Sequence, residues 1–478
     1  PYGAKSWWPS KNALNDKIDS LDVILDVFPL YFEGVSNGVL ISNEVAADSS
    51  YRRFHWKHKY PIATYLIAIA VADYSFEEQF YTMDDDSLRV VNYVYKGYEN
   101  LASRQIENLH RSAVLFDSLF MPYPFEQEQY GHAQMGRGGG MEHQTMTFVG
   151  SWSFELLTHE LAHQWFGNYV TLANWHDIWL NEGFATYLSG LAYEKAFDTD
   201  KWWNIWRPQM VSYIASEPGG SVYVEDIQDV GRIFDPRLSY AKGAWVLHML
   251  RWVIGDEPFF QGIRNYLSNP EVAFGYATHD DLVYHLEQSG DTSLTAFFND
   301  WYYGEGYPTY HIDCNIQTET NAWITINQSQ SHSSVNFFEM PVPVRFKNEN
   351  EDTTIVFRHH SNGQQFYTEI GFTPDSVFVD PEYWLISAEN TFTVRENPVK
   401  KNVIIFAPNP VHDLVRVFST KPLENVKLFR PDGSLFSDLG KPSENPFYFD
   451  FTNHRGGMYI FRFRFEDGDA LTRKLVVY

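Results

Sequence analysis

The sequence predicts a multidomain α+β protein, because of its length and of two changes in pattern along it. A length of 478 residues suggests about three or four domains, each able to bury a core. Residues 1–77 are strand-rich, and residues 78–309 are mixed and then mainly helical. Short alternating runs return in residues 310–394 and 403–478, as in β-sandwiches. We therefore expect a β-rich N-terminal part, a mixed α/β domain, and two β-sandwiches joined by a linker at residues 395–402.

The composition is that of a large folded protein. Hydrophobic residues make up 44% of the chain and aromatic residues 17%, which excludes intrinsic disorder. The net charge of −25 argues against nucleic-acid binding and favours solubility. The longest apolar run, residues 62–72, is too short to be a transmembrane segment and is expected to form a buried strand. With Cys314 as its single cysteine, the chain has no internal disulfide.

The stretch THELAHQW contains an H-E-x-x-H motif formed by His159, Glu160 and His163. Apolar residues recur around the motif at helical spacing, so we expect a helix. Residues four apart on a helix share one face, and both histidines can then bind the same metal ion. By itself the motif leaves a second interpretation open, in which two surface histidines lie on an amphipathic helix.

Glu182 favours the metal interpretation. It follows His163 after eighteen residues, in the stretch WLNEGFATYL, which we expect to be a second helix. Two histidines and one carboxylate leave one position of a zinc ion open, as in catalytic sites, whereas a structural site would need a fourth ligand and Cys314 is far away. We expect one zinc ion per chain, which activates a water as nucleophile. Glu160 is expected to be the general base and then the proton donor to the leaving amine.

This combination resembles the gluzincin aminopeptidases of the aminopeptidase N family, whose catalytic domain is thermolysin-like. The resemblance extends to that family's G-x-M-E-N loop, which reads GGMEH here. In the family this loop is an edge strand beside the cleft, and its glutamate binds the free α-amino group of the substrate, a role that falls to Glu142. The loop residues that would approach the substrate backbone are Gly139, Gly140 and Met141. A carboxylate fixed there turns an endopeptidase groove into an exopeptidase pocket.

Two further segments resemble the same family. The stretch SYAKGAWVLHML resembles the segment whose tyrosine hydrogen-bonds the oxyanion, and it places that role on Tyr240. Tyr240 is one of thirty tyrosines, and the alternative is a packing residue on a helix. The stretch FFNDWYYGEGYP, residues 297–308, resembles the end of the family's catalytic domain. The resemblance covers roughly residues 1–390.

Four positions depart from the family pattern. His143 stands where Asn is usual, and Ser189 lies two helical turns after Glu182, where a carboxylate might orient a ligand histidine. Near the start, YGAKSWWPSKN resembles the end of the family's N-terminal β-domain, with Lys5 for the usual Arg and Ser10 for the usual Cys. That motif normally follows a long stretch of sequence, so we expect this chain to be a fragment of a longer protein.

The composition changes near residue 400. All fifteen tryptophans precede residue 385, and residues 401–478 carry 11 basic and 9 acidic residues, a net charge of +2 that leaves −27 for the rest. The P-N-P opening, the central D-G turn, the G-x-Y-I strand and the basic last strand resemble the C-terminal sorting domain of the type IX secretion system of Bacteroidetes-type bacteria. The resemblance implies export by the bacterial secretion machinery to the medium or the cell surface. The alternative is an accessory binding module.

The expected function is that of a secreted zinc aminopeptidase acting on peptides with a free N-terminus. A zinc endopeptidase of the thermolysin type is the nearest alternative, but it would not need Glu142. An inactive peptide-binding or adhesion protein is a second alternative, but binding alone needs neither Glu160 nor Tyr240.

Overall fold

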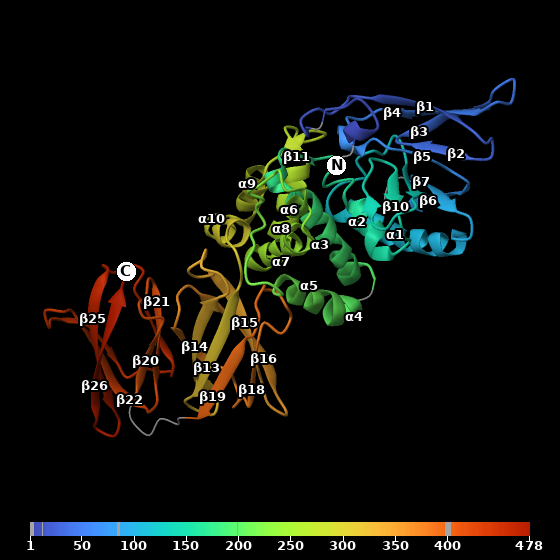
Figure 1. The fold of residues 1–478 in the computed structure, drawn as a ribbon. Coiled ribbons are helices and arrows are strands. Elements are labelled where there is room, and N and C mark those ends of the chain that lie inside the picture. The colour runs from blue at the N-terminus through green and yellow to red at the C-terminus, as the bar shows by residue number, and fades with distance from the viewer. Residues whose placement is uncertain (1–3, 12, 84–86, 198, 397–402) are drawn as a thin grey trace. The chain divides into compact units, whose positions relative to one another are not determined.

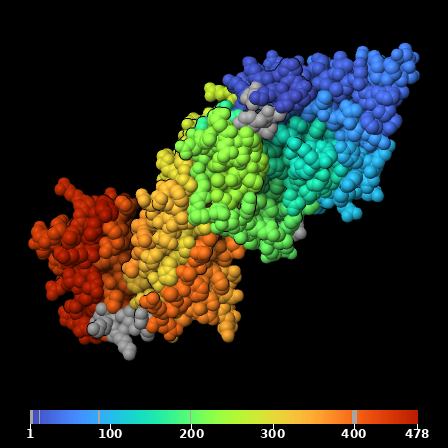
Figure 2. All heavy atoms as spheres, in the orientation of Figure 1, coloured from blue at the N-terminus to red at the C-terminus, as the bar shows by residue number. Residues whose placement is uncertain are grey.

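The structure is a computed structural model (Figure 1) that describes residues 4–11, 13–83, 87–197, 199–396 and 403–478. Contacts between residues divide the chain into two compact units. Unit 1 runs to Tyr307 and includes residues 331–336 and 382–386, and unit 2 holds the remaining residues from Pro308 onward. Figure 2 shows the same chain with all heavy atoms. A multidomain organisation of mixed α and β structure is thus confirmed.

Unit 1 begins with two small antiparallel sheets, one with the strand order β1-β4-β3 and one that pairs β2 with β5. Their bounds are β1 Leu21–Val27, β2 Glu33–Ser36, β3 Val39–Val45, β4 Arg52–His58 and β5 Ile69–Ala72. The prediction of one buried strand over residues 62–72 is wrong, because Thr64–Leu66 form a 3-10 turn that interrupts the run and β5 begins only at Ile69. Ile69 and Val71 are exposed, since β5 belongs to a sheet of two strands. An apolar run alone does not distinguish a strand from a buried turn.

A five-stranded sheet with the order β6-β7-β8-β10-β9 follows. Its bounds are β6 Tyr74–Thr82, β7 Ser87–Tyr95, β8 Tyr130–Gln134, β9 Gly140–Met141 and β10 Thr147–Val149. The short strand β9 lies at the edge and pairs antiparallel with β10, Gly140 opposite Val149 and Met141 opposite Phe148. The expected domain boundary after residue 77 falls within β6. The division of residues 1–309 into two domains stays a prediction.

The helices of unit 1 build the region around the H-E-x-x-H motif. They include α1 Glu99–Leu119, α2 Phe154–Ala162, α3 Trp179–Lys195, α5 Arg207–Ile214, α7 Gly243–Ile254, α8 Asp256–Leu267 and α9 His279–Gly290. Helix α3 is buried around nearly its whole circumference and packs against α2 and α7. A Cβ atom on Gly183 would lie 3.0 Å from the carbonyl carbon of Gly243, so two glycines allow α3 and α7 to cross closely. None of the described helices is long and apolar enough to cross a membrane.

Unit 2 contains two β-sandwiches, as the alternating sequence pattern predicts. The first has sheets of order β17-β14-β13-β19 and β16-β15-β18, and the second has sheets of order β20-β21-β24 and β23-β22-β25-β26. The bounds in the first are β13 Pro308–Ile316, β14 Asn321–Gln330, β15 Met340–Lys347, β16 Asp352–His359, β17 Gln364–Glu369, β18 Ser376–Val379 and β19 Thr391–Glu396. The bounds in the second are β20 Ile404–Ala407, β21 Leu414–Ser419, β22 Leu423–Phe429, β23 Leu435–Gly440, β24 Phe447–Asp450, β25 Gly457–Phe465 and β26 Ala470–Val477.

The strands of the sandwiches bury one face and expose the other, which explains the alternating sequence pattern. In β13 every second residue is buried. The second sandwich has a hydrophobic core of its own, to which both of its sheets contribute, Val415 and Val417 from one and Val426 and Phe461 from the other. The linker expected at residues 395–402 falls mostly outside the described residues, and its first two residues end β19.

Candidate metal centre

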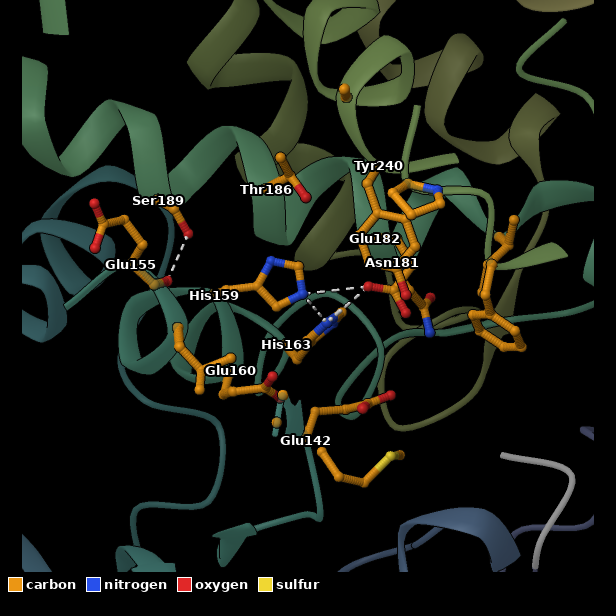
Figure 3. A pocket seen from close by; sticks show the side chains of 18 of the residues that line it. Glu142, Glu155, His159, Glu160, His163, Asn181, Glu182, Thr186, Ser189 and Tyr240 are labelled. Carbon is orange, nitrogen blue, oxygen red and sulfur yellow. Dashed lines mark hydrogen bonds and ion pairs between the residues drawn. The ribbon is translucent and has the colours of Figure 1, made fainter. Parts of the chain in front are cut away.

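The two histidines of the motif lie one helical turn apart, as predicted. His159 is in α2, His163 follows its last residue, and their Nε2 atoms are 3.1 Å apart. Each Nε2 atom lies 3.3 Å from the Oε2 atom of Glu182 in α3 (Figure 3). Three potential ligand atoms from two packed helices therefore converge on one point.

The protonation states of these groups fit a cation. The Nδ1 atom of His163 lies 3.0 Å from the carbonyl oxygen of Phe166, so Nδ1 keeps its proton and Nε2 is the nitrogen that a metal would bind in place of a proton. Burial would raise the pKa of the Glu182 carboxyl, but the charge of His163 and hydrogen bonds from both histidines outweigh burial and hold it well below its usual range. Two imidazoles and one carboxylate are a donor set that suits zinc, and the centre is a site for one zinc ion.

Glu160 lies next to this site, in space that a glycine leaves free. A Cβ atom on Gly140 would come within 2.0 Å of Oε1 of Glu160, so the carboxyl group packs directly against the bare backbone of β9. Its Oε2 atom is buried without a hydrogen-bond partner among the described residues. Burial raises the pKa of Glu160 well above its usual value, with the charge of His163 opposing and the charges of Glu142 and Glu182 adding. A carboxyl group with an open buried oxygen is suited to exchange a proton with a bound molecule.

Glu142 follows β9 directly and is buried, with 7% of its surface exposed. One carboxylate oxygen each of Glu142 and Glu160 and a ring nitrogen of His163 all lie within 4.8 Å of one another. The backbone carbonyl of Glu142 accepts a hydrogen bond from Nδ2 of Asn168 at 2.8 Å, which fixes the end of the strand. Gly139, the residue before β9, has a positive φ of 81°, a conformation that favours glycine.

Tyr240 lies in a π-helical segment, Pro236–Lys242, just before α7. Its ring stacks on that of His159, with 6.0 Å between ring centroids and an angle of 11° between the planes. Burial and then the charges of Glu182 and Glu142 raise its pKa far above the usual value. The Tyr240 hydroxyl therefore stays protonated and remains a hydrogen-bond donor beside the metal site.

All nine predicted site residues are brought together around one pocket of about 740 Å³, and every one of them is among its lining residues. Figure 3 shows Glu155 and Ser189 beyond His159, on the side away from Glu142. Sequence reasoning missed several lining residues: Tyr65, Trp175, Ile178, Asn181 and Phe234. Asn181 precedes Glu182 in the second motif, and its Nδ2 atom lies 3.4 Å from the Tyr65 hydroxyl. These two residues are 116 positions apart and meet only in the folded chain, so nothing in the sequence signals the contact.

Two of the four departures lie near the site. The Ser189 hydroxyl donates hydrogen bonds to the carbonyl oxygens of Ala185 at 3.0 Å and Glu155 at 3.2 Å, so it completes helix packing and supplies no carboxylate. His143 is half-buried with its ring edge-to-face against Phe148 at 4.8 Å between centroids, and desolvation lowers its pKa to about 3. His143 is therefore a neutral packing residue behind the loop.

The fold and the site place two histidines and a glutamate where they can hold one zinc ion, and the chain can be compared with known zinc proteins. Residues 141–301 match the family model described as the peptidase family M1 domain. Aminopeptidase M1-A of Oryza sativa subsp. japonica is 28% identical to the chain over 315 residues, which cover 60% of this chain and 35% of that protein. The chain thus spans about a third of that relative's length.

Two solved structures share the fold. The structure of Legionella pneumophila aminopeptidase A in complex with aspartic acid superposes with a TM-score of 0.64 at 16% identity and covers 81% of this chain and 46% of that one. The structure of a mutant two-domain M1 zinc metallopeptidase bound to L-tryptophan gives a TM-score of 0.53 at 23% identity over 60% of this chain and 64% of that one.

Proposed function

We propose that this chain is a zinc aminopeptidase that removes single residues from peptides with a free N-terminus. The observation that carries this proposal is the position of the Glu142 carboxylate, within 4.8 Å of a nitrogen of His163. In an amino acid the α-nitrogen and the carbonyl carbon are separated by one atom, or about 2.5 Å. A substrate whose first carbonyl lies at the metal site would therefore place its α-ammonium group beside Glu142.

Three residues of the chain then have separate roles in the reaction. When bound, zinc supplies Lewis-acid chemistry, since it lowers the pKa of water and polarises a carbonyl. Glu160 accepts the proton that the attacking water loses, and delivers it to the nitrogen of the leaving peptide. Tyr240 donates its hydroxyl proton in a hydrogen bond to the carbonyl oxygen as that atom becomes negative. Glu142 holds the α-ammonium group and closes the cleft beyond the first residue.

The walls near Glu142 favour a large apolar first residue. Tyr65 and Ile178 belong to a buried hydrophobic cluster against which three further lining residues pack, Met141, Trp175 and Phe234. No lysine or arginine is found among the described lining residues, so an acidic first side chain would have no cation to pair with. A panel of aminoacyl anilides should therefore be cleaved fastest with Leu, Met or Phe and slowest with Asp or Glu.

Metal analysis combined with an aminoacyl-anilide assay tests the proposed activity. We expect one zinc ion per chain in the parent and in Glu160→Gln, but a rate lower by about a hundred- to ten-thousand-fold in the variant. His163→Ala should lose both zinc and activity. An active Glu160→Gln would refute the general-base role. A protein that binds zinc but cleaves no substrate would be the peptide-binding alternative.

We further propose that the second sandwich, residues 403–478, is a secretion sorting domain and that the protein is exported. Support comes from its own hydrophobic core and from its resemblance to such domains in sequence. Deletion of residues from about 400 onward should leave peptidase activity intact and stop export in the native host. A shortened protein that loses zinc or fails to fold would show that this sandwich is structural, and unchanged export would favour an accessory module.

A further inference from the structure

Three buried polar side chains, linked by hydrogen bonds, lie outside the pocket and reach the loop that carries Glu142. The Nδ1 atom of His58, at the end of β4, lies 2.6 Å from Oε2 of Glu128, and both side chains are fully buried. The Nε2 atom of His58 lies 2.8 Å from Nε2 of Gln144. None of the three residues lines the pocket.

The hydrogen bonds that link these three side chains have one consistent direction. The carboxylate of Glu128 can only accept, so the proton of His58 sits on Nδ1 and the Nε2 lone pair accepts from the amide of Gln144. The second amide proton of Gln144 goes to the carbonyl oxygen of Pro61 at 3.0 Å. The other oxygen of Glu128 accepts from the backbone N–H of Lys59 at 2.6 Å.

Gln144 lies two residues after Glu142, in a turn that side chains hold from several directions. Its backbone carbonyl accepts from Nδ2 of Asn37 at 2.7 Å, and the next N–H, of Thr145, donates to Oε1 of Gln164 at 3.0 Å. Thr145 has a positive φ of 63°, which costs energy in a residue other than glycine. The turn therefore keeps its shape through these contacts, because its own backbone preference does not favour that shape.

We propose that His58, Glu128 and Gln144 are positioning residues that set where the Glu142 carboxylate stands. This inference rests on the proposed aminopeptidase function. Burying an imidazole and a carboxylate is costly, and well-packed apolar side chains of the same volume are often equally stable. The bonds of the His58–Glu128 pair end on Gln144 and on the backbone next to His58, so the pair links β4 to the turn after Glu142.

The test is a double-mutant cycle on kcat/KM for leucine p-nitroanilide and a free-amine peptide. Gln144→Met keeps the length of the side chain and removes both hydrogen bonds. We expect it to lower kcat/KM by about ten- to a hundred-fold, mainly through KM, with zinc content unchanged. In a Glu142→Ala background the same change should cost no more than about twofold, because the group that Gln144 positions is absent.

Two further variants complete the design. Glu128→Gln keeps the volume and one acceptor oxygen, so it should fold and show a smaller loss of kcat/KM with the same dependence on Glu142. Gln328→Met is the matched control, because the Gln328 amide is also buried and lies 3.3 Å from Nδ1 of His359, but in unit 2. It should lower the unfolding temperature and leave kcat/KM unchanged.

Three outcomes would count against the inference. Equal losses from Gln144→Met with and without Glu142 would show that the three residues act on stability alone. A loss of kcat/KM in Gln328→Met as large as in Gln144→Met would show the same. A parent whose activity does not depend on Glu142 would overturn the proposed function itself, and this inference with it.

Discussion

The two sides of the pocket are built differently. On one side, the zinc ligands stand on α2 and α3, helices buried in the centre of unit 1 and packed against each other. On the other side, Glu142 lies between a two-residue edge strand and a turn that side-chain hydrogen bonds hold. Regular helix packing fixes the side chains that would bind the metal, whereas individual side-chain contacts fix the group that would select an N-terminus.

This difference predicts how each side responds to substitution. Changes on the helix side should affect zinc binding or the chemical step. Changes on the β9 side should leave zinc in place and alter which substrates are used.

The largest effect expected from a conservative change is at Tyr240. Tyr240→Phe keeps the ring that stacks on His159 and removes only the hydroxyl. We expect kcat to fall by about a hundred- to a thousand-fold with KM little changed, as for the loss of one oxyanion donor. Steady-state kinetics on leucine p-nitroanilide measures this, with zinc analysis as the control. A variant with normal kcat would make Tyr240 a packing residue.

The next effect sharpens the boundary between the two sides. Gly140→Ala places a methyl group 2.0 Å from the present position of Oε1 of Glu160, so the carboxyl group must move. We expect kcat/KM to fall by about ten- to a hundred-fold with zinc retained. Gly138→Ala is the matched control, because its added Cβ atom meets nothing within 4 Å, and it should be close to the parent. Equal activity of both variants would contradict the placement of Glu160 against β9.

A smaller and graded effect is expected from pH on zinc affinity. Burial alone would lower the pKa of His163, but the charges of Glu182 and Glu142 outweigh burial and raise it to about 10 in the metal-free protein. Below that pH zinc must displace one proton, so its affinity should rise about tenfold per pH unit between pH 6 and 8. Competition with a chelator at several pH values measures this. An affinity that is constant with pH would contradict it.

The same difference explains how much the sequence could predict. The H-E-x-x-H motif and Glu182 could be placed because helical periodicity determines which side chains share a face. The apolar wall at Tyr65 could not, because the run that contains it forms a turn and not the expected strand. Neither could the contact of His58 with Gln144, since residues 86 positions apart meet only through long-range packing. The resemblance to a known family supplied Glu142 and Tyr240, which no periodicity would have selected.

The most direct test of the central claim compares matched peptides with free and acetylated N-termini, in the parent and in Glu142→Ala. The parent should cleave the free peptide one residue at a time and ignore the acetylated one, because acetylation removes the charge that pairs with Glu142. Loss of a buried charge-assisted contact costs about 2–5 kcal/mol. The variant should therefore keep its zinc and lose about thirty- to several-thousand-fold in kcat/KM on the free peptide. Efficient cleavage of the acetylated peptide by the parent would contradict the account and indicate an endopeptidase.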